Sequence, residues 1–92
     1  MPTFAVEYTY DPAAAALRDE HRPAHRRFLG EGHEAGRVLL SGPYADGTGA
    51  LLMIAADDEQ AVADYLATDP FALVGAIGAT RITAWTQVYG PF

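Results

Sequence analysis

Hydrophobic and polar residues alternate at the start of the chain. Over residues 3–10 every second side chain is large and apolar or aromatic, and those between are small or polar. This alternation predicts a β-strand with one strongly apolar face. That face would carry Phe4, Val6, Tyr8 and Tyr10. The Asp11-Pro12 pair should end the strand.

A helical pattern follows. Residues 13–20 can form a turn or two of helix, but Pro23 inside a helix would lose a hydrogen bond and clash with the preceding turn. We therefore expect Pro23 in the first turn of a main helix that ends at Gly36. His25 would lie in the first turns, where the positive end of the helix dipole favours the neutral imidazole that can act as a base. It should face the apolar side, which continues with Phe28, Leu29 and Gly32.

Two further strands are expected in the middle of the chain. Residues 37–44 form the first, interrupted at Gly42-Pro43, and residues 46–49 have the composition of a hairpin turn. Residues 50–56 are apolar on both faces, which is typical of a central strand in a covered sheet.

The last third of the chain predicts a second helix and a final strand. Asp57 should cap the helix, with Gln60 completing a capping box, and its inner stripe would consist of Ala61, Val62, Tyr65 and Leu66. The helix should stop before Asp69-Pro70, where Asp69 can cap a short turn over residues 71–77. Residues 80–89 then alternate as the last strand.

The predicted order is strand, helix, strand, strand, helix, strand. This order is that of the α+β, ferredoxin-like βαββαβ fold, in which four antiparallel strands carry both helices on one face. The second face of the sheet would carry a mixture of Leu, Trp, Tyr and Thr, and such an apolar patch indicates an interface. We therefore expect a homodimer that pairs sheet to sheet, which also enlarges the core of so short a chain.

Composition and charge narrow the function classes. The 92 residues predict a single domain over 1–92, and the lack of cysteine excludes disulfides, thiolate metal sites and a cysteine nucleophile. No apolar run is long enough to span a membrane, and the first residues do not resemble a signal peptide, so a soluble cytoplasmic protein without a membrane partner is expected. The formal net charge of −6 argues against binding of nucleic acid.

The arginines are unevenly placed. There is no lysine, and five of the six arginines lie in or near the first helix: Arg18, Arg22, Arg26, Arg27 and Arg37. They could form a solvated face paired with neighbouring carboxylates. Alternatively, one of them could face an anionic substrate, and Arg22, beside Pro23, is the best placed.

His25 and Asp69 are the first candidates for chemistry, because each is expected at the inner edge of a helix. Together they could form an acid–base pair, or a buried histidine satisfied by a carboxylate for stability alone. His21 and His25 have the spacing of a metal pair, but Pro23 separates them and no third ligand is evident, so no metal is expected. The segment Ser41-Gly42-Pro43-Tyr44 offers hydroxyls and a close backbone approach, although a strand break with a β-bulge would explain it equally well.

Three segments in register resemble the YciI-like (YCII-related) family: Arg22-Pro23-Ala24-His25, residues 36–43 and Asp69-Pro70-Phe71. The resemblance implies a fold like that of muconolactone isomerase, with ferredoxin-like chains paired as a dimeric α+β barrel. It places an active site at His25 and Asp69, and one subgroup of the family removes chloride from a chlorinated hydroxyhydroquinone.

We accordingly expect a cofactor-independent lyase or isomerase acting on a small aromatic or enolisable, possibly anionic, substrate. His25 would move the proton and Asp69 would fix its tautomer. Substrate binding would involve Arg22, Ser41, Gly42, Pro43, Tyr44 and Phe71. The alternative is a non-catalytic module for binding a small ligand or for dimerisation, in which His25 would be sealed from any cavity.

Overall fold

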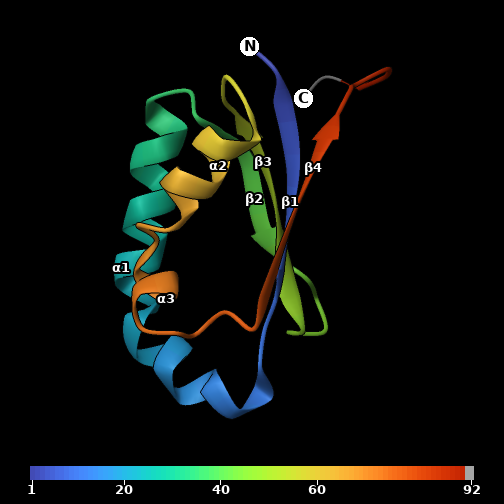
Figure 1. Ribbon diagram of the computed structural model, residues 1–92. Coiled ribbons are helices and arrows are strands. Elements are labelled where there is room, and N and C mark those ends of the chain that lie inside the picture. Colours follow the sequence, from blue (N-terminus) through green and yellow to red (C-terminus); the bar gives the residue numbers. More distant parts are fainter. Residues whose placement is uncertain (91–92) are drawn as a thin grey trace.

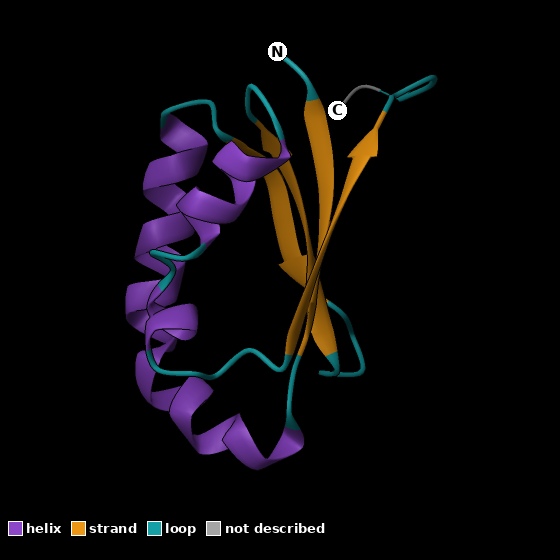
Figure 2. Cartoon of the chain, in the orientation of Figure 1, coloured by secondary structure: helices purple, strands orange, loops and turns teal. Residues whose placement is uncertain are grey.

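The chain folds into one antiparallel sheet covered on one face by helices (Figures 1 and 2). The structure is a computed structural model that describes residues 1–90. The strands are β1 (Thr3–Thr9), β2 (Val38–Pro43), β3 (Gly49–Ala55) and β4 (Ala79–Trp85), in the spatial order β2-β3-β1-β4. The helices are α1 (Ala15–Glu34), α2 (Glu59–Leu66) and the short α3 (Pro70–Leu73), with a 3₁₀ turn at Pro12–Ala14 before α1. The predicted ferredoxin-like βαββαβ fold is confirmed.

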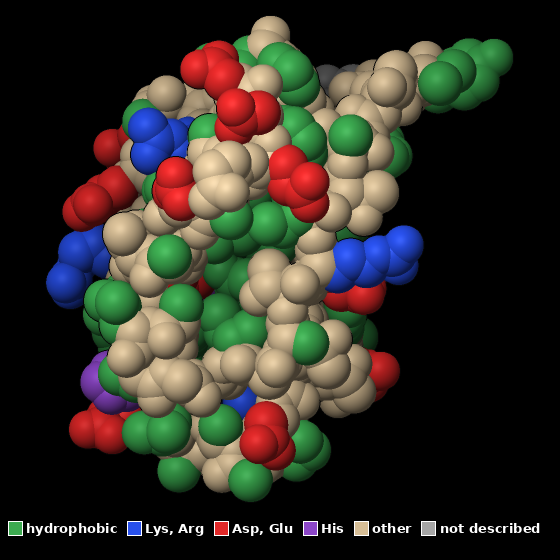
Figure 3. All heavy atoms as spheres, in the orientation of Figure 1, with side chains coloured by type: hydrophobic (Ala, Val, Ile, Leu, Met, Phe, Trp, Pro, Cys, Tyr) green, Lys and Arg blue, Asp and Glu red, His purple; other side chains and the backbone are tan. Residues whose placement is uncertain are grey.

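Strands β1 and β3 form the centre of the sheet, a position that the apolar pattern of residues 50–56 predicted for β3. Val6 of β1 lies opposite Leu52 of β3 on one side and Ile82 of β4 on the other. Side chains on this face meet the helices and form the main core, whose fully buried members include Val6, Tyr8, Leu52, Ile54 and Val62. The helices cover β4 least, since Ile82 is only half-buried, and Figure 3 shows hydrophobic side chains in a recess between the helices and β4.

The expectation that Pro23 begins the main helix is wrong. One helix runs from Ala15 to Glu34 with Pro23 inside it, so His25 lies near the middle and the dipole argument for its protonation state does not apply. Pro23 removes one hydrogen bond of the helix, the one to the backbone carbonyl of Asp19. This loss is tolerable because both residues are exposed, so the carbonyl can bond to water. Tertiary contacts hold the helix on both sides of the proline, through Arg18 before it and His25 after it.

Arg18 does not belong to a solvated face. It is only 6% exposed, and its Nη1 donates hydrogen bonds to the backbone oxygens of Asp11 (2.9 Å) and Ala76 (3.2 Å). Its guanidinium lies 4.4 Å from the centroid of the Tyr10 ring, a cation–π geometry. The arginine therefore ties the start of α1 to the loop after α3, a long-range contact that helix periodicity could not reveal.

Three local boundaries differ from the predictions. Asp58, not Asp57, caps α2 by accepting from Ala61 N, and Gln60 bonds to Asp64 rather than completing a capping box. The register of β2 shifts between Val38 and Leu40, ahead of the expected break at Gly42-Pro43, which stays paired with β3. Strand β4 ends at Trp85 and does not continue to Tyr89.

The second face of the sheet carries no helix among residues 1–90. Three large hydrophobic side chains are each about two-fifths exposed there: Leu39, Leu51 and Trp85. Single exposed hydrophobic residues are common on protein surfaces, so the grouping of the three is the informative observation. With Leu40 and Met53 they line a hollow of about 350 Å³. This face therefore has the apolar character that the alternating strands predicted. No helix in the described part of the chain is long and apolar enough to cross a membrane.

Candidate functional site

The site is organised around the carboxylate of Asp69, which is completely buried. Asp69 is the N-cap of α3, and its Oδ1 accepts a hydrogen bond from Phe71 N at 2.9 Å. Pro70 at the first helical position fixes the backbone for this cap. The Asp-Pro-Phe sequence thus positions the carboxylate locally, as the sequence predicted, before any distant residue contributes.

His25 supplies the second contact to this carboxylate. Its Nδ1 lies 2.8 Å from Oδ1 and 3.1 Å from Oδ2 of Asp69. Since a carboxylate only accepts hydrogen bonds, Nδ1 must carry the proton. The predicted side-chain hydrogen bond between the two residues is therefore present.

The other ring nitrogen of His25 is accessible. Nε2 has no hydrogen-bond partner within residues 1–90. The one side-chain nitrogen or oxygen in that range that is both fully buried and unpartnered is Tyr65 Oη. Nε2 therefore keeps contact with solvent, although His25 as a whole is only 8% exposed. In the neutral ring this nitrogen carries the lone pair, which can accept a proton.

Tyr8 is the third group on Asp69, and sequence reasoning missed it. Its Oη donates to Asp69 Oδ2 at 2.9 Å from the central strand β1. Burial, reinforced by the negative charge of Asp69 and this hydrogen bond, raises the pKa of Tyr8 far above its ordinary value. The available signal was the alternation that placed Tyr8 in the core, because a buried tyrosine usually needs a partner for its hydroxyl. With Tyr8, His25 and Phe71 N, a fully buried carboxylate has three donors.

Aromatic rings fix the orientation of the imidazole. The ring of Phe71 is stacked on that of His25, with centroids 3.8 Å apart and an interplanar angle of 3°. Tyr10 and Phe71 form an edge-to-face pair, with ring centroids 6.1 Å apart. Phe71, the second residue of α3, therefore donates its backbone N–H to Asp69 and packs its side chain on the histidine.

A pocket of about 210 Å³ opens beside His25, between α1 and the β2–β3 half of the sheet. Of the residues predicted to bind substrate, five line it together with His25: Arg22, Ser41, Gly42, Pro43 and Phe71. Tyr44 lies outside this lining, and its Oη instead donates to Glu7 Oε2 at 2.5 Å. Tyr44 therefore contacts β1 through Glu7 and does not join the pocket that its neighbours line.

Five further lining residues escaped the sequence analysis as site residues: Tyr10, Arg26, Leu29, Ala50 and Leu52. A signal for Arg26 existed, because it follows Arg22 at i+4 and therefore shares its helix face. Arg22 also forms an exposed ion pair with Asp19, at 2.6 Å between Nη1 and Oδ1. Arg22 is therefore paired with a neighbouring carboxylate, as one of the two expectations had it, and it also lines the pocket.

Other histidines stand apart from this site. His21 Nε2 is 3.9 Å from Glu20 Oε2, and His33 Nδ1 bonds to Val38 O at 2.7 Å. No group of three or more potential metal-ligating side chains occurs within the described residues.

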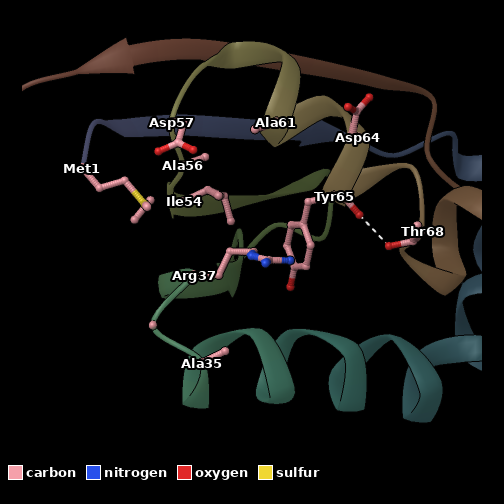
Figure 4. A pocket seen from close by; sticks show the side chains of 12 residues that line it. Met1, Ala35, Arg37, Ile54, Ala56, Asp57, Ala61, Asp64, Tyr65 and Thr68 are labelled. Carbon is pink, nitrogen blue, oxygen red and sulfur yellow. Dashed lines mark hydrogen bonds between the residues drawn. The ribbon is translucent and has the colours of Figure 1, made fainter.

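A larger cleft of about 630 Å³ lies elsewhere, between the end of α1, α2 and β3. Figure 4 shows the Arg37 side chain extended along the Tyr65 ring within it, with the guanidinium carbon 4.8 Å from the ring centroid. Asp57 and Asp64 also line the cleft. It contains no buried hydrogen-bonded acid–base pair comparable to His25 and Asp69, so its size alone does not make it the site.

The family of this protein is assigned from a match that covers nearly the whole chain. The model of the YCII-related domain matches residues 3–86. The chain belongs to the YCII-related family. Its match includes His25, Asp69 and every strand described above. Among curated proteins, none matches this chain.

A solved structure with the same fold is 5-chloro-2-hydroxyhydroquinone dehydrochlorinase from Burkholderia phenoliruptrix AC1100, in complex with 2,5-dihydroxybenzoquinone. The TM-score is 0.81 at 24% sequence identity, with 94% of this chain and 95% of that chain covered. At this identity the likeness establishes the shared fold, over essentially the full length of both proteins.

Proposed function

We propose that this YCII-related protein is a cofactor-independent, cytoplasmic enzyme that moves a proton on a small aromatic or enolisable anion. Elimination, isomerisation and cyclisation all fit this description. The observation that carries the proposal is the asymmetric environment of His25, which lines the pocket: Nδ1 is bonded to buried Asp69, while Nε2 has no partner within residues 1–90 and keeps contact with solvent.

In this mechanism Nε2 of His25 takes a proton from the substrate, and the electron pair left behind forms the new π bond. In an elimination the pair displaces the leaving group, and in an isomerisation the proton returns at another atom. Asp69 holds Nδ1–H and stabilises the imidazolium that forms during the transfer. Because Phe71 stacks on the imidazole, the ring need not reorganise when it gains charge.

The pocket suits a ligand of about one ring. Its volume of about 210 Å³ is below the ~300–1,000 Å³ of sites for drug-sized molecules. Phe71, Tyr10 and Leu52 offer apolar walls, while Arg22 and the Ser41 hydroxyl can meet an anionic oxygen. The structural likeness to a dehydrochlorinase acting on a chlorinated hydroxyhydroquinone agrees with this class of substrate.

The test combines a specific substrate with a general readout of proton transfer. The protein should release chloride from 5-chloro-2-hydroxyhydroquinone, or incorporate deuterium from D₂O into one-ring enolisable anions. His25→Ala should reduce either rate about 10²–10⁴-fold. His21→Ala is the matched control, because His21 lies one turn earlier on α1 and does not line the pocket.

The alternative function is a non-catalytic module that binds a small ligand in the same pocket. It predicts that 2,5-dihydroxybenzoquinone binds to the wild-type protein and to His25→Ala alike, with neither chloride release nor deuterium incorporation. That combination would replace the enzymatic proposal. The accessible Nε2 favours catalysis, since a merely structural histidine has no need of an open lone pair.

A further inference from the structure

The permanently charged side chains that line the His25 pocket are all positive, although the protein as a whole is acidic. Among the described residues that line the pocket, the permanently charged ones are Arg22 and Arg26, and none is an aspartate or glutamate. The chain has a formal net charge of −6. A local cluster of positive charge in an apolar cleft attracts anions and orients them on approach.

The two arginines are not equivalent. Arg22 is already engaged by Asp19 at 2.6 Å. Arg26 has no ion pair, hydrogen bond or ring contact within residues 1–90, and its side chain is exposed. A ligand that binds Arg22 must compete with Asp19, whereas one that binds Arg26 displaces only water.

We propose that Arg26 is the principal anion-binding residue of this pocket, and that with Arg22 it selects ligands bearing two anionic oxygens on one ring. Residues at i and i+4 of a helix are neighbours on its surface, with Cβ atoms about 5–6 Å apart, so both guanidinium groups can reach a single ring bound in the pocket that they line. Each guanidinium can offer charge-assisted hydrogen bonds to one oxygen. His25, which lies between the two arginines in sequence and lines the same pocket, would then face the ring that both anchors hold.

This inference rests on the proposed function only in taking the His25 pocket as the ligand site. It is tested by binding, with 2,5-dihydroxybenzoquinone as the dianionic probe, because both its hydroxyl groups are vinylogous acids that ionise at neutral pH. The uncharged 2,5-dimethoxybenzoquinone is the matched neutral probe. The test does not measure turnover. A protein that binds the dianion through Arg26 but catalyses no reaction would contradict the enzymatic proposal and leave this inference standing.

Arg26→Gln should weaken binding of the dianion about 10- to 100-fold and leave binding of the neutral probe within twofold. Arg22→Gln should weaken dianion binding by less, because Asp19 already occupies that side chain. Arg27→Gln is the control, since it removes the same charge from the next residue of α1 but does not line the pocket. Arg26→Lys should restore part of the affinity by returning the charge.

Two results would overturn the inference. In the first, Arg26→Gln and Arg27→Gln weaken dianion binding equally, which would reduce the effect to net charge. In the second, the wild-type protein binds the dianion no more tightly than the neutral probe, or not at all. Thermal melts of the variants identify any loss of binding that arises from unfolding, and the exposed position of Arg26 predicts unchanged melting temperatures.

Discussion

Oδ1 of Asp69 accepts two hydrogen bonds, one from His25 Nδ1 at 2.8 Å and one from Phe71 N at 2.9 Å. His25 lies 44 residues before Asp69 in the sequence, whereas Phe71 lies 2 residues after it. The Phe71 group is a backbone N–H, which can only donate a hydrogen bond. The oxygen that accepts the backbone cap is therefore also the one nearer to the histidine.

This geometry predicts the behaviour of Asp69→Asn. Because Phe71 N must donate, the asparagine carbonyl oxygen should take the Oδ1 position and keep Nδ1 of His25 protonated. The loss of turnover should then come from the missing negative charge. We expect a reduced rate with an unchanged tautomer, measurable from the ¹⁵N chemical shifts of the neutral imidazole. A shift of the proton to Nε2 in the variant would contradict the argument.

Tyr8 predicts a loss of stability at alkaline pH. Burial raises its pKa in the folded state above the ordinary value of 10.0, so the folded protein retains a proton that the unfolded chain releases. The contribution is complete below pH ~10 and falls by about 1.4 kcal/mol for each further pH unit. Tyr8→Phe should show a correspondingly shallower decline in urea unfolding experiments between pH 9 and 11.

At neutral pH Tyr8→Phe should instead lower the free energy of unfolding by ~1–3 kcal/mol, because Asp69 loses a buried donor. Tyr89→Phe removes an equivalent hydroxyl from a side chain that is 92% exposed and serves as the control. Equal unfolding free energies for the two variants at pH 7 would contradict a stabilising role for the Tyr8–Asp69 contact.

Substitutions at Gly32 and Tyr65 should have coupled effects on stability. A Cβ at Gly32 would lie 2.1 Å from Tyr65 Oη and 2.9 Å from Val38 Cγ2, so Gly32→Ala should destabilise the protein by ~1–3 kcal/mol. Tyr65→Phe should be neutral or stabilising, because its buried hydroxyl has no partner. The double variant should recover part of the loss.

Gly30→Ala is the control for this pair, since nothing lies within 4 Å of its added Cβ. It should raise the melting temperature through the better helix propensity of alanine, worth about 1 kcal/mol. Thermal melts of the four variants at one protein concentration test the set. Additive effects of Gly32→Ala and Tyr65→Phe would contradict the steric explanation.

The exposed apolar face of the sheet predicts a homodimer. Light scattering at micromolar concentration should give about twice the 9.8 kDa of one chain, and Leu51→Glu should yield monomers by placing a charge within that face. Leu73→Glu is the control, because Leu73 is 71% exposed on α3, away from the sheet. A monomeric wild-type protein would contradict the prediction.

The sequence by itself determined the order of the elements and the local geometry at Asp69. Alternation identified β1, an apolar pattern on both faces identified the central β3, and the Asp-Pro-Phe sequence predicted the cap of α3. These features depend on side-chain periodicity and on contacts over a few residues, which a linear pattern contains. The His25–Asp69 pair could be anticipated because each residue occupies an inner edge of its own helical segment.

Tertiary structure alone decided the remaining features. It carried α1 through Pro23, because Arg18 and His25 are anchored by distant segments on either side of the proline. It brought Tyr8 to Asp69 from 61 positions away and placed Tyr44 outside the pocket. Each of these outcomes depends on which side chains meet across the layers, and that meeting is set by the packing of helices on the sheet rather than by the preferences of neighbouring residues.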